Sequence, residues 1–327
     1  MAVRKLALVM LAAAAGGLGR SPAQPLPASR IQVLWRDPAD IASKNLFYGS
    51  GGKSHQPRGP FHFIEEDRDG TNPKFVVRDR DGTKWKVKLG VEARPETAAS
   101  RLVWAAGYFT DEDYFLPKIT VQAMPRLHRG QNLVAPDGSI LNVRLKREPG
   151  GRKKLGYWRW NSNPFGGTRE LNGLKTLMAL LNNWDLKDDN NAIREEGDKL
   201  VYLVSDLGAS FGGGTLRFHD WRAKGNLEAY ERSRLFRKVH TRTVDFLSPA
   251  FPDWIYIFNP PIFVRSLRLE KLGRNIPRSD ARWLGRLLSR LSQRQIQDAF
   301  RAAGFSPAEV EDYSKVVAGR IAQLSDL

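Results

Sequence analysis

Alternating apolar and polar positions in the first half of the chain predict β-strands. The run from Lys84 to Leu89 alternates strictly, and Arg80-Asp81-Gly82 directly before it is a typical hairpin turn. Together with two earlier runs, this pattern predicts a three-stranded meander, with further strands after it. The predicted strands cover residues 60–66, 74–78, 84–89, 114–123 and 139–147.

Helical spacing of apolar residues begins after the meander and dominates the second half. Behind Pro95, apolar residues recur every three to four positions from Ala98 onward, which predicts a helix. From about residue 168 the pattern is mostly helical, and Ser292 and Ser306 stand where N-caps belong. A β-rich first half joined to an α-rich second half predicts an α+β fold with two lobes and a cleft between them.

The N-terminus has the pattern of an export signal. Arg4 and Lys5 precede the apolar run Leu6–Leu18, which is shorter than the roughly 20 residues of a membrane span, and Ala23 ends a stretch of small residues. We therefore expect an exported protein, periplasmic or secreted; an uncleaved anchor or a buried helix is the alternative. The expected divisions are a signal peptide (1–23), an extension or linker (24–59), a β-rich N-lobe (60–150) and a helical C-lobe (151–327).

Composition narrows the chemistry. The 327 residues contain no cysteine, which excludes disulfides, thiolate zinc sites, iron–sulfur clusters and a cysteine nucleophile. Lys and Arg number 52 against 35 Asp and Glu, a formal charge of +17. Such an excess predicts an anionic partner, either nucleic acid, phosphate or a membrane surface.

Carboxylates and amides are concentrated in the segment 183–191, which follows a predicted helix. Asp206 lies 16 positions past Asn190, after a second apolar strand. Phosphoryl transfer needs a carboxylate that orients the attacking hydroxyl, and an amide and a second carboxylate that hold Mg²⁺. Asp185 fits the first role, and Asn190 and Asp206 fit the metal-binding roles. Lys187 is placed to meet charge that develops on the transferred group.

These motifs resemble those of the protein-kinase-like superfamily. Residues 185–190, Asp-Leu-Lys-Asp-Asp-Asn, are similar to the catalytic-loop pattern, and Asp206-Leu-Gly stands where such enzymes carry Asp-Phe-Gly. Asn183-Trp184 replaces the usual His-Arg, which points to atypical branches. Those branches include phosphoinositide 3/4-kinase-like, HipA-type, secretory-pathway and spore-coat kinases.

The first half carries a second part of the resemblance. Residues 88–96, Lys-Leu-Gly-Val-Glu-Ala-Arg-Pro-Glu, resemble a stretch of phosphoinositide 3-kinase-like enzymes. The resemblance implies that Lys88 grips the nucleotide phosphates and that Glu96 pairs with it. The alternative is a solvated ladder formed by Lys84, Lys86 and Lys88 on an edge strand. If one of these lysines does bind the phosphates, Lys86 is the second candidate after Lys88.

A phosphate-covering loop is expected between the first two predicted strands, at residues 67–72. Gly70 and its neighbouring amides suit phosphate oxygens, although the same residues equally make an ordinary hairpin turn. Residues 47–54 end like a P-loop, but Phe47 stands where that motif requires glycine. The segment 144–160 interleaves basic and aromatic residues, which suits stacking on bases or insertion at a membrane interface.

The chain is therefore expected to be an ATP-dependent phosphotransferase that uses Mg²⁺ or Mn²⁺. Its partners would be a nucleotide and an acceptor that is a protein, a lipid or a small molecule, with a possible anionic surface and no specific nucleic acid. Two alternatives stay open: a catalytically inactive kinase-like binding module, and a basic protein that binds the envelope or an anionic polymer.

Overall fold

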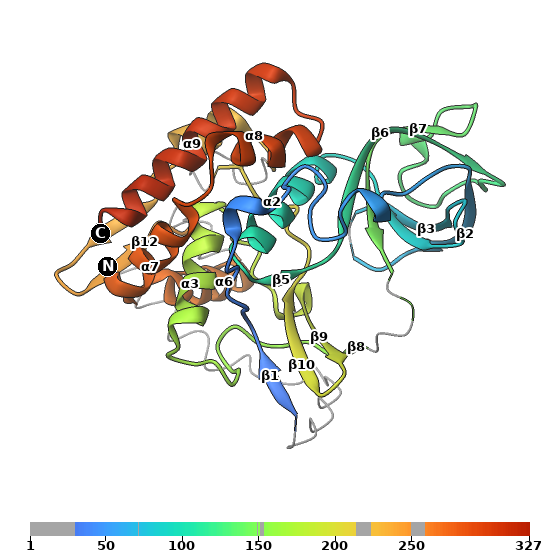
Figure 1. The fold of residues 1–327 in the computed structure, drawn as a ribbon. Coiled ribbons are helices and arrows are strands. Elements are labelled where there is room, and N and C mark those ends of the chain that lie inside the picture. Colours follow the sequence, from blue (N-terminus) through green and yellow to red (C-terminus); the bar gives the residue numbers. More distant parts are fainter. Residues whose placement is uncertain (1–29, 71, 149, 151–153, 214–223, 250–258) are drawn as a thin grey trace.

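The computed structural model describes residues 30–327 apart from 71, 149, 151–153, 214–223 and 250–258 (Figure 1). The expected signal peptide, residues 1–23, lies outside the described residues. In the part of the chain that is described, no helix combines the length and the apolar character that crossing a membrane requires.

Five strands of the first half form a closed barrel. They are β2 (Phe61–Asp67), β3 (Lys74–Arg78), β4 (Lys84–Lys88), β6 (Asp113–Gln122) and β7 (Ser139–Arg147). The order around the barrel is β2-β3-β4-β7-β6, and a parallel pairing of β2 with β6 closes it. The strands predicted from alternation are confirmed, whereas the closure joins two segments far apart in the sequence.

The two-residue period of each strand divides its side chains between the barrel interior and its outer surface. Trp85 and Val87 of β4 and Val143 and Leu145 of β7 lie in the apolar interior. Lys88 is the direct cross-strand partner of Arg144, so these two cations stand side by side on the outer face of the barrel, where both are buried.

Helix α2 (Ala93–Ala105) leaves β4 and links the barrel to the rest of the molecule. It packs against β6 and β7 of the barrel and against α8 (Gln293–Ala302) of the second half. Figure 1 shows it between the barrel and the helices. Its apolar residues, among them Ala98 and Leu102, belong to the larger core that the helices share, as helical spacing predicts.

A second sheet lies beside the helices. Its strands are β1 (Ile31–Val33), β5 (Phe109–Thr110), β8 (Lys154–Gly156), β9 (Asn191–Glu196) and β10 (Lys199–Val204). Strand β10 pairs antiparallel with β9 and parallel with β1 and β5. Because Val204 pairs with Asn191, the residues just after β10 lie beside those just before β9.

Helices make up most of the second half. They are α3 (Arg169–Leu180), α4 (Leu227–Arg232), α6 (Pro260–Gly273), α7 (Arg278–Leu288), α8 and α9 (Pro307–Ser325), with a small sheet of β11 (Phe236–Val239), β12 (Thr243–Phe246) and β13 (Ile276–Pro277). Ser292 and Ser306 both form capping boxes, as expected. The predicted α+β architecture, with a strand-rich first half and a helical second half, is confirmed.

The segment before the barrel is packed into the fold. Residues 24–59 were expected to be an extension or linker, but Leu34, Ile41 and Leu46 are buried in the same core as the helices. Arg290 and Gln295, near the C-terminal end, hydrogen-bond to backbone carbonyl oxygens of this segment. The described part of the segment is therefore integral to the helical lobe.

Candidate active site

The ammonium group of Lys88 lies at the centre of the site. Its Nζ is 2.7 Å from Asp206 Oδ1, 2.8 Å from Glu96 Oε2 and 2.9 Å from Glu92 Oε2. Lys88 ends a barrel strand, the two glutamates lie at the start of α2, and Asp206 follows β10 of the second sheet. Both halves of the chain thus supply one ion-pair cluster.

Burial and neighbouring charges act in opposite directions on this cluster. Burial alone would lower the pKa of Lys88, but Glu96 and Asp206 outweigh it and raise that pKa. Burial would likewise raise the pKa of Asp206, yet the adjacent Lys88 lowers it overall. The lysine and the aspartate therefore remain ionised at neutral pH.

The three lysines of β4 differ sharply in environment. Lys84 is exposed, and Lys86 forms an ion pair with Asp67 at 2.7 Å. Lys88 is only 3% exposed. A solvated lysine ladder therefore does not describe Lys88.

A second buried cation holds the far side of Glu96. Arg144 Nη2 donates to Glu96 Oε1 at 2.8 Å, and Arg144 Nε lies 3.9 Å from Asp113 Oδ1. Burial raises the pKa of Asp113 to about 7 against the opposing effect of Arg144. Sequence reasoning placed Arg144 only in a basic segment; the signal that could have found it is its cross-strand pairing with Lys88.

Glu92 is a site residue that sequence reasoning missed. It contacts Lys88 and Lys224 and accepts a hydrogen bond from Asn72 Nδ2 at 2.6 Å. Gly208 lies directly against it, since a Cβ added at Gly208 would be 2.8 Å from Glu92 Cβ. The signal available was its position four residues after Lys88, at the start of a predicted helix.

A left-handed backbone turn places the Asp206 carboxylate. Its φ is +51°, an uncommon conformation for which aspartate is one of the better-suited residues. The turn follows immediately after β10, so the side chain leaves the sheet and reaches Lys88. Gly208 then allows the chain to pass close to α2.

The predicted catalytic loop is held together by its own side chains. Lys187 Nζ lies 3.1 Å from Asp185 Oδ2, and Asn190 Nδ2 donates to the backbone oxygen of Asp185 at 2.8 Å. The backbone N–H of Ser205 donates to the oxygen of Asn190 at 2.8 Å. The structure thus brings Asp185, Lys187 and Asn190 together and joins them to the residue before Asp206.

Gly70 lies in the hairpin between β2 and β3, with a φ of +66° that suits glycine. Its carbonyl oxygen accepts a hydrogen bond from Arg129. Within the described residues, Gly70 forms no hydrogen bond with Lys88; the same hairpin reaches the cluster through Asn72 instead.

The three carboxylates that contact Lys88 are also of the kind that binds a divalent cation. One oxygen from each of Glu92, Glu96 and Asp206 lies within 4.8 Å of the others, and carboxylate oxygens are the preferred ligands of Mg²⁺ and a suitable set for Mn²⁺. Of the two residues predicted to hold metal, Asp206 belongs to this group. Asn190 instead directs its Nδ2 towards Asp185.

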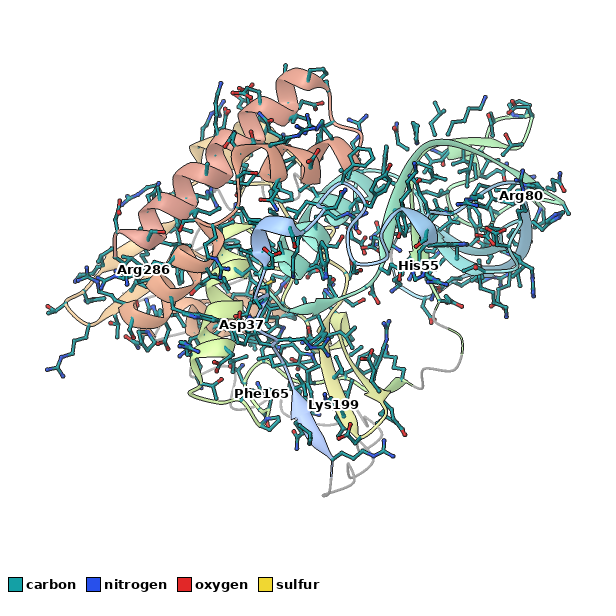
Figure 2. All side chains as sticks on the ribbon, in the orientation of Figure 1. Asp37, His55, Arg80, Phe165, Lys199 and Arg286 are labelled. Atoms are coloured by element: carbon teal, nitrogen blue, oxygen red, sulfur yellow. The ribbon has the colours of Figure 1, made fainter. Side chains whose placement is uncertain are left out.

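A groove of about 1120 Å³ lies apart from this cluster. Its lining includes Asp37, Lys44, His55, Glu112 and Arg147 but none of the predicted site residues; Figure 2 labels two of the lining residues, Asp37 and His55. This groove therefore does not mark the candidate chemistry.

The aromatic residues of the segment 144–160 are not a continuous ligand surface. Trp158 and Trp160 are each 2% exposed and belong to the helical core. Tyr157 is exposed, with Lys154 over its ring. The two tryptophans are therefore unable to stack on bases or enter a membrane interface, because their rings pack against core residues.

The chain matches no protein-family model and no curated protein. Among solved structures, it is similar to the Helicobacter pylori proinflammatory kinase CtkA, with 12% identity and a TM-score of 0.46 over 83% of this chain and 97% of that one. It is also similar to the Golgi casein kinase, with 11% identity and a TM-score of 0.36 over 88% of this chain and 74% of that one. A structure of the Golgi casein kinase with Mn and ADP bound gives 10% identity and a TM-score of 0.41 over 88% and 73% of the two chains.

Proposed function

We propose that the chain is an ATP-dependent phosphotransferase of the atypical kinase type. The observation that carries this proposal is the contact of one buried ammonium, that of Lys88, with Glu96 at 2.8 Å and with Asp206 at 2.7 Å across 118 positions of sequence. Phosphoryl transfer requires a lysine for the phosphates, a partner that fixes it, and a metal-binding carboxylate.

Each residue then has a defined task. Lys88 binds the phosphates, and Glu96 keeps the lysine charged and oriented. Asp185 accepts a hydrogen bond from the acceptor hydroxyl and takes its proton, while Lys187 faces charge on the transferred group. Mg²⁺ or Mn²⁺ would be held by Asp206 and, on the loop side, by Asn190, and it would neutralise phosphate charge.

Replacing Asp185 with asparagine tests this assignment. We expect phosphate transfer from [γ-³²P]ATP to fall by roughly 10²- to 10⁴-fold, because a positioned base contributes about that much. Mg·ATP should still raise the melting temperature of the variant, since the lysine cluster is intact. Asp189→Asn, an exposed aspartate of the same loop, is the matched control and should retain wild-type transfer.

The alternatives give different results in the same assays. A folded Asp185→Asn variant with full activity would remove the mechanism. Wild-type protein that gains no thermal stability from Mg·ATP favours the inactive binding module. Binding to an anionic polymer that falls steeply with salt and is unchanged in Asp206→Ala favours the polymer-binding protein.

We also propose that the enzyme acts outside the cytoplasm, after removal of residues 1–23. The support is the basic start and the apolar run at Leu6–Leu18. N-terminal sequencing of the protein from expressing cells should then begin at Gln24. Leu8→Arg, which interrupts the apolar run, should abolish cleavage. Wild-type protein that retains Met1 in the cytoplasmic fraction would overturn the proposal.

A further inference from the structure

Helix α6 contacts three residues of the candidate catalytic loop, although about 80 positions separate the two segments. Arg265 Nη2 donates to Asp185 Oδ1 at 2.7 Å. Arg268 contacts Asp188 Oδ1. At the end of the helix, Gly273 lies against Trp184, because a Cβ there would be 3.0 Å from Trp184 Cη2.

Two of these contacts fix the helix on the loop. Arg268 Nη2 reaches an aspartate that also accepts a hydrogen bond from the backbone N–H of Trp160 at 3.3 Å. Gly273 allows the indole of Trp184 to approach the helix closely. Residues three apart lie on one helix face, so a helix anchored by Arg268 presents Arg265 to the same loop.

Arg265 completes the set of groups around the Asp185 carboxylate. Lys187 and Asn190, which reach Oδ2 at 3.1 and 3.4 Å, belong to the same loop as the aspartate. The side chains of Lys187 and Arg265 are similarly exposed, at 52% and 49%, so exposure alone does not rank their ion pairs with Asp185. Arg265 reaches the other oxygen from outside the loop, and its planar guanidinium has a defined direction of donation.

We propose that Arg265 is a positioning residue for Asp185, and that α6 is thereby part of the catalytic apparatus. The inference rests on the proposed function, in which Asp185 must meet the acceptor hydroxyl at a set angle. Arg265 holds Oδ1 from outside while the loop holds Oδ2, so the carboxylate cannot rotate away. Misplacing a reacting group by about 1 Å costs on the order of 10²-fold in rate.

The first experiment compares Arg265→Gln and Arg265→Lys with wild-type protein. The readouts are autophosphorylation and phosphate release from [γ-³²P]Mg·ATP, which need no identified acceptor. We expect Arg265→Gln to lower kcat roughly 10- to 100-fold and to leave the KM for ATP unchanged. Arg265→Lys, which keeps the charge without the planar fork, should lie between the two.

The control is an arginine on a distant helix face. Arg286 of α7, labelled in Figure 2, is exposed, and among the described residues its side chain forms no hydrogen bond or ion pair with the loop, so Arg286→Gln should leave kcat and KM at wild-type values. Thermal unfolding of every variant shows whether it is folded.

A double-mutant cycle separates positioning from a general structural effect. If Arg265 acts through Asp185, Arg265→Gln should have no further effect on kcat in an Asp185→Asn background. If Arg265→Gln acts through a general structural effect, its fold-loss in kcat should instead multiply with the fold-loss caused by Asp185→Asn.

The outcomes distinguish this inference from the proposed function. The inference would be overturned by a folded Arg265→Gln variant with wild-type kcat, or by losses in kcat that multiply in the double-mutant cycle. In either case an inactive Asp185→Asn variant would still uphold the proposed function. Wild-type protein that neither binds nor turns over Mg·ATP would overturn the function, and the inference with it.

Discussion

At the scale of single residues, the buried cations Lys88 and Arg144 share one carboxylate. Glu96 gives one oxygen to each of them, at 2.8 Å in both cases. Removing one member of a buried ionic network leaves its partners uncompensated and typically costs about 3–5 kcal/mol. Substitutions at these positions therefore test stability and chemistry together, which is why Asp185 and Arg265, both partly exposed, are the sharper probes of mechanism.

Asp113, beyond Arg144, gives a prediction about pH. Its folded pKa of about 7 lies above the ordinary value near 4, so between about pH 4 and 7 the folded protein keeps a proton that the unfolded chain has lost. This group's contribution to stability is full below that window and is lost as pH rises through it, by at most about 1.4 kcal/mol per pH unit. Asparagine has no carboxyl to ionise, so the Asp113→Asn variant should not lose this stability as pH rises.

The measurement is the free energy of unfolding in urea at pH 5 and pH 8. The unfolding free energy of Asp113→Asn minus that of wild type should be more positive at pH 8 than at pH 5. Asp198→Asn, at an exposed turn, should show an equal difference from wild type at both values. A pH-independent effect of Asp113→Asn would show that its carboxyl is not held protonated in the folded protein.

At the scale of elements, the segment before the barrel contributes more than its composition indicates. Pro-rich and polar stretches surround Leu34, Ile41 and Leu46, and no periodic pattern marks these three as core residues. Their burial depends on partners near the other end of the chain, which no local window contains.

Replacing Ile41 with alanine tests this packing. Ile41 is fully buried, so the substitution should cost about 2–5 kcal/mol of unfolding free energy. Ile31, which is 56% exposed on β1, is the matched control, and Ile31→Ala should change stability by less than about 0.5 kcal/mol. Equal effects of the two changes, measured by chemical denaturation, would show that the segment is peripheral.

The elements also show where sequence reasoning succeeds. Alternation located the barrel strands because one face of each is apolar, and spacing located α2 and the capped helices. The parallel closure of β2 on β6 left no signal, since it depends on how the strands meet in space. Arg265 and Arg268 likewise resemble any solvated arginines until α6 is seen to lie on the loop.

At the scale of the whole molecule, the Lys and Arg residues do not all lie on the surface. Several cations are internal: Lys88 and Arg144 belong to the carboxylate cluster, and Arg320 donates to the backbone oxygens of Leu180 and Tyr230 at 2.9 and 3.0 Å. The buried Arg101 donates to the backbone oxygen of Asp113 at 2.6 Å. These four buried cations are offset by five buried carboxylates, those of Asp79, Glu92, Glu96, Asp111 and Asp113, so burial does not account for the excess of +17.

The docking of the first described residues onto the last helices also constrains when the chain can fold. Gln295 donates to the backbone oxygens of Ile41 and Lys44 at 3.0 and 2.9 Å, across more than 250 positions of sequence. A ribosome makes residues 30–46 first and their partners on α8 last. The helical core therefore cannot close around a growing chain. It completes only when synthesis of the chain is nearly finished, because Gln295 and its neighbours on α8 are made near the end of the chain.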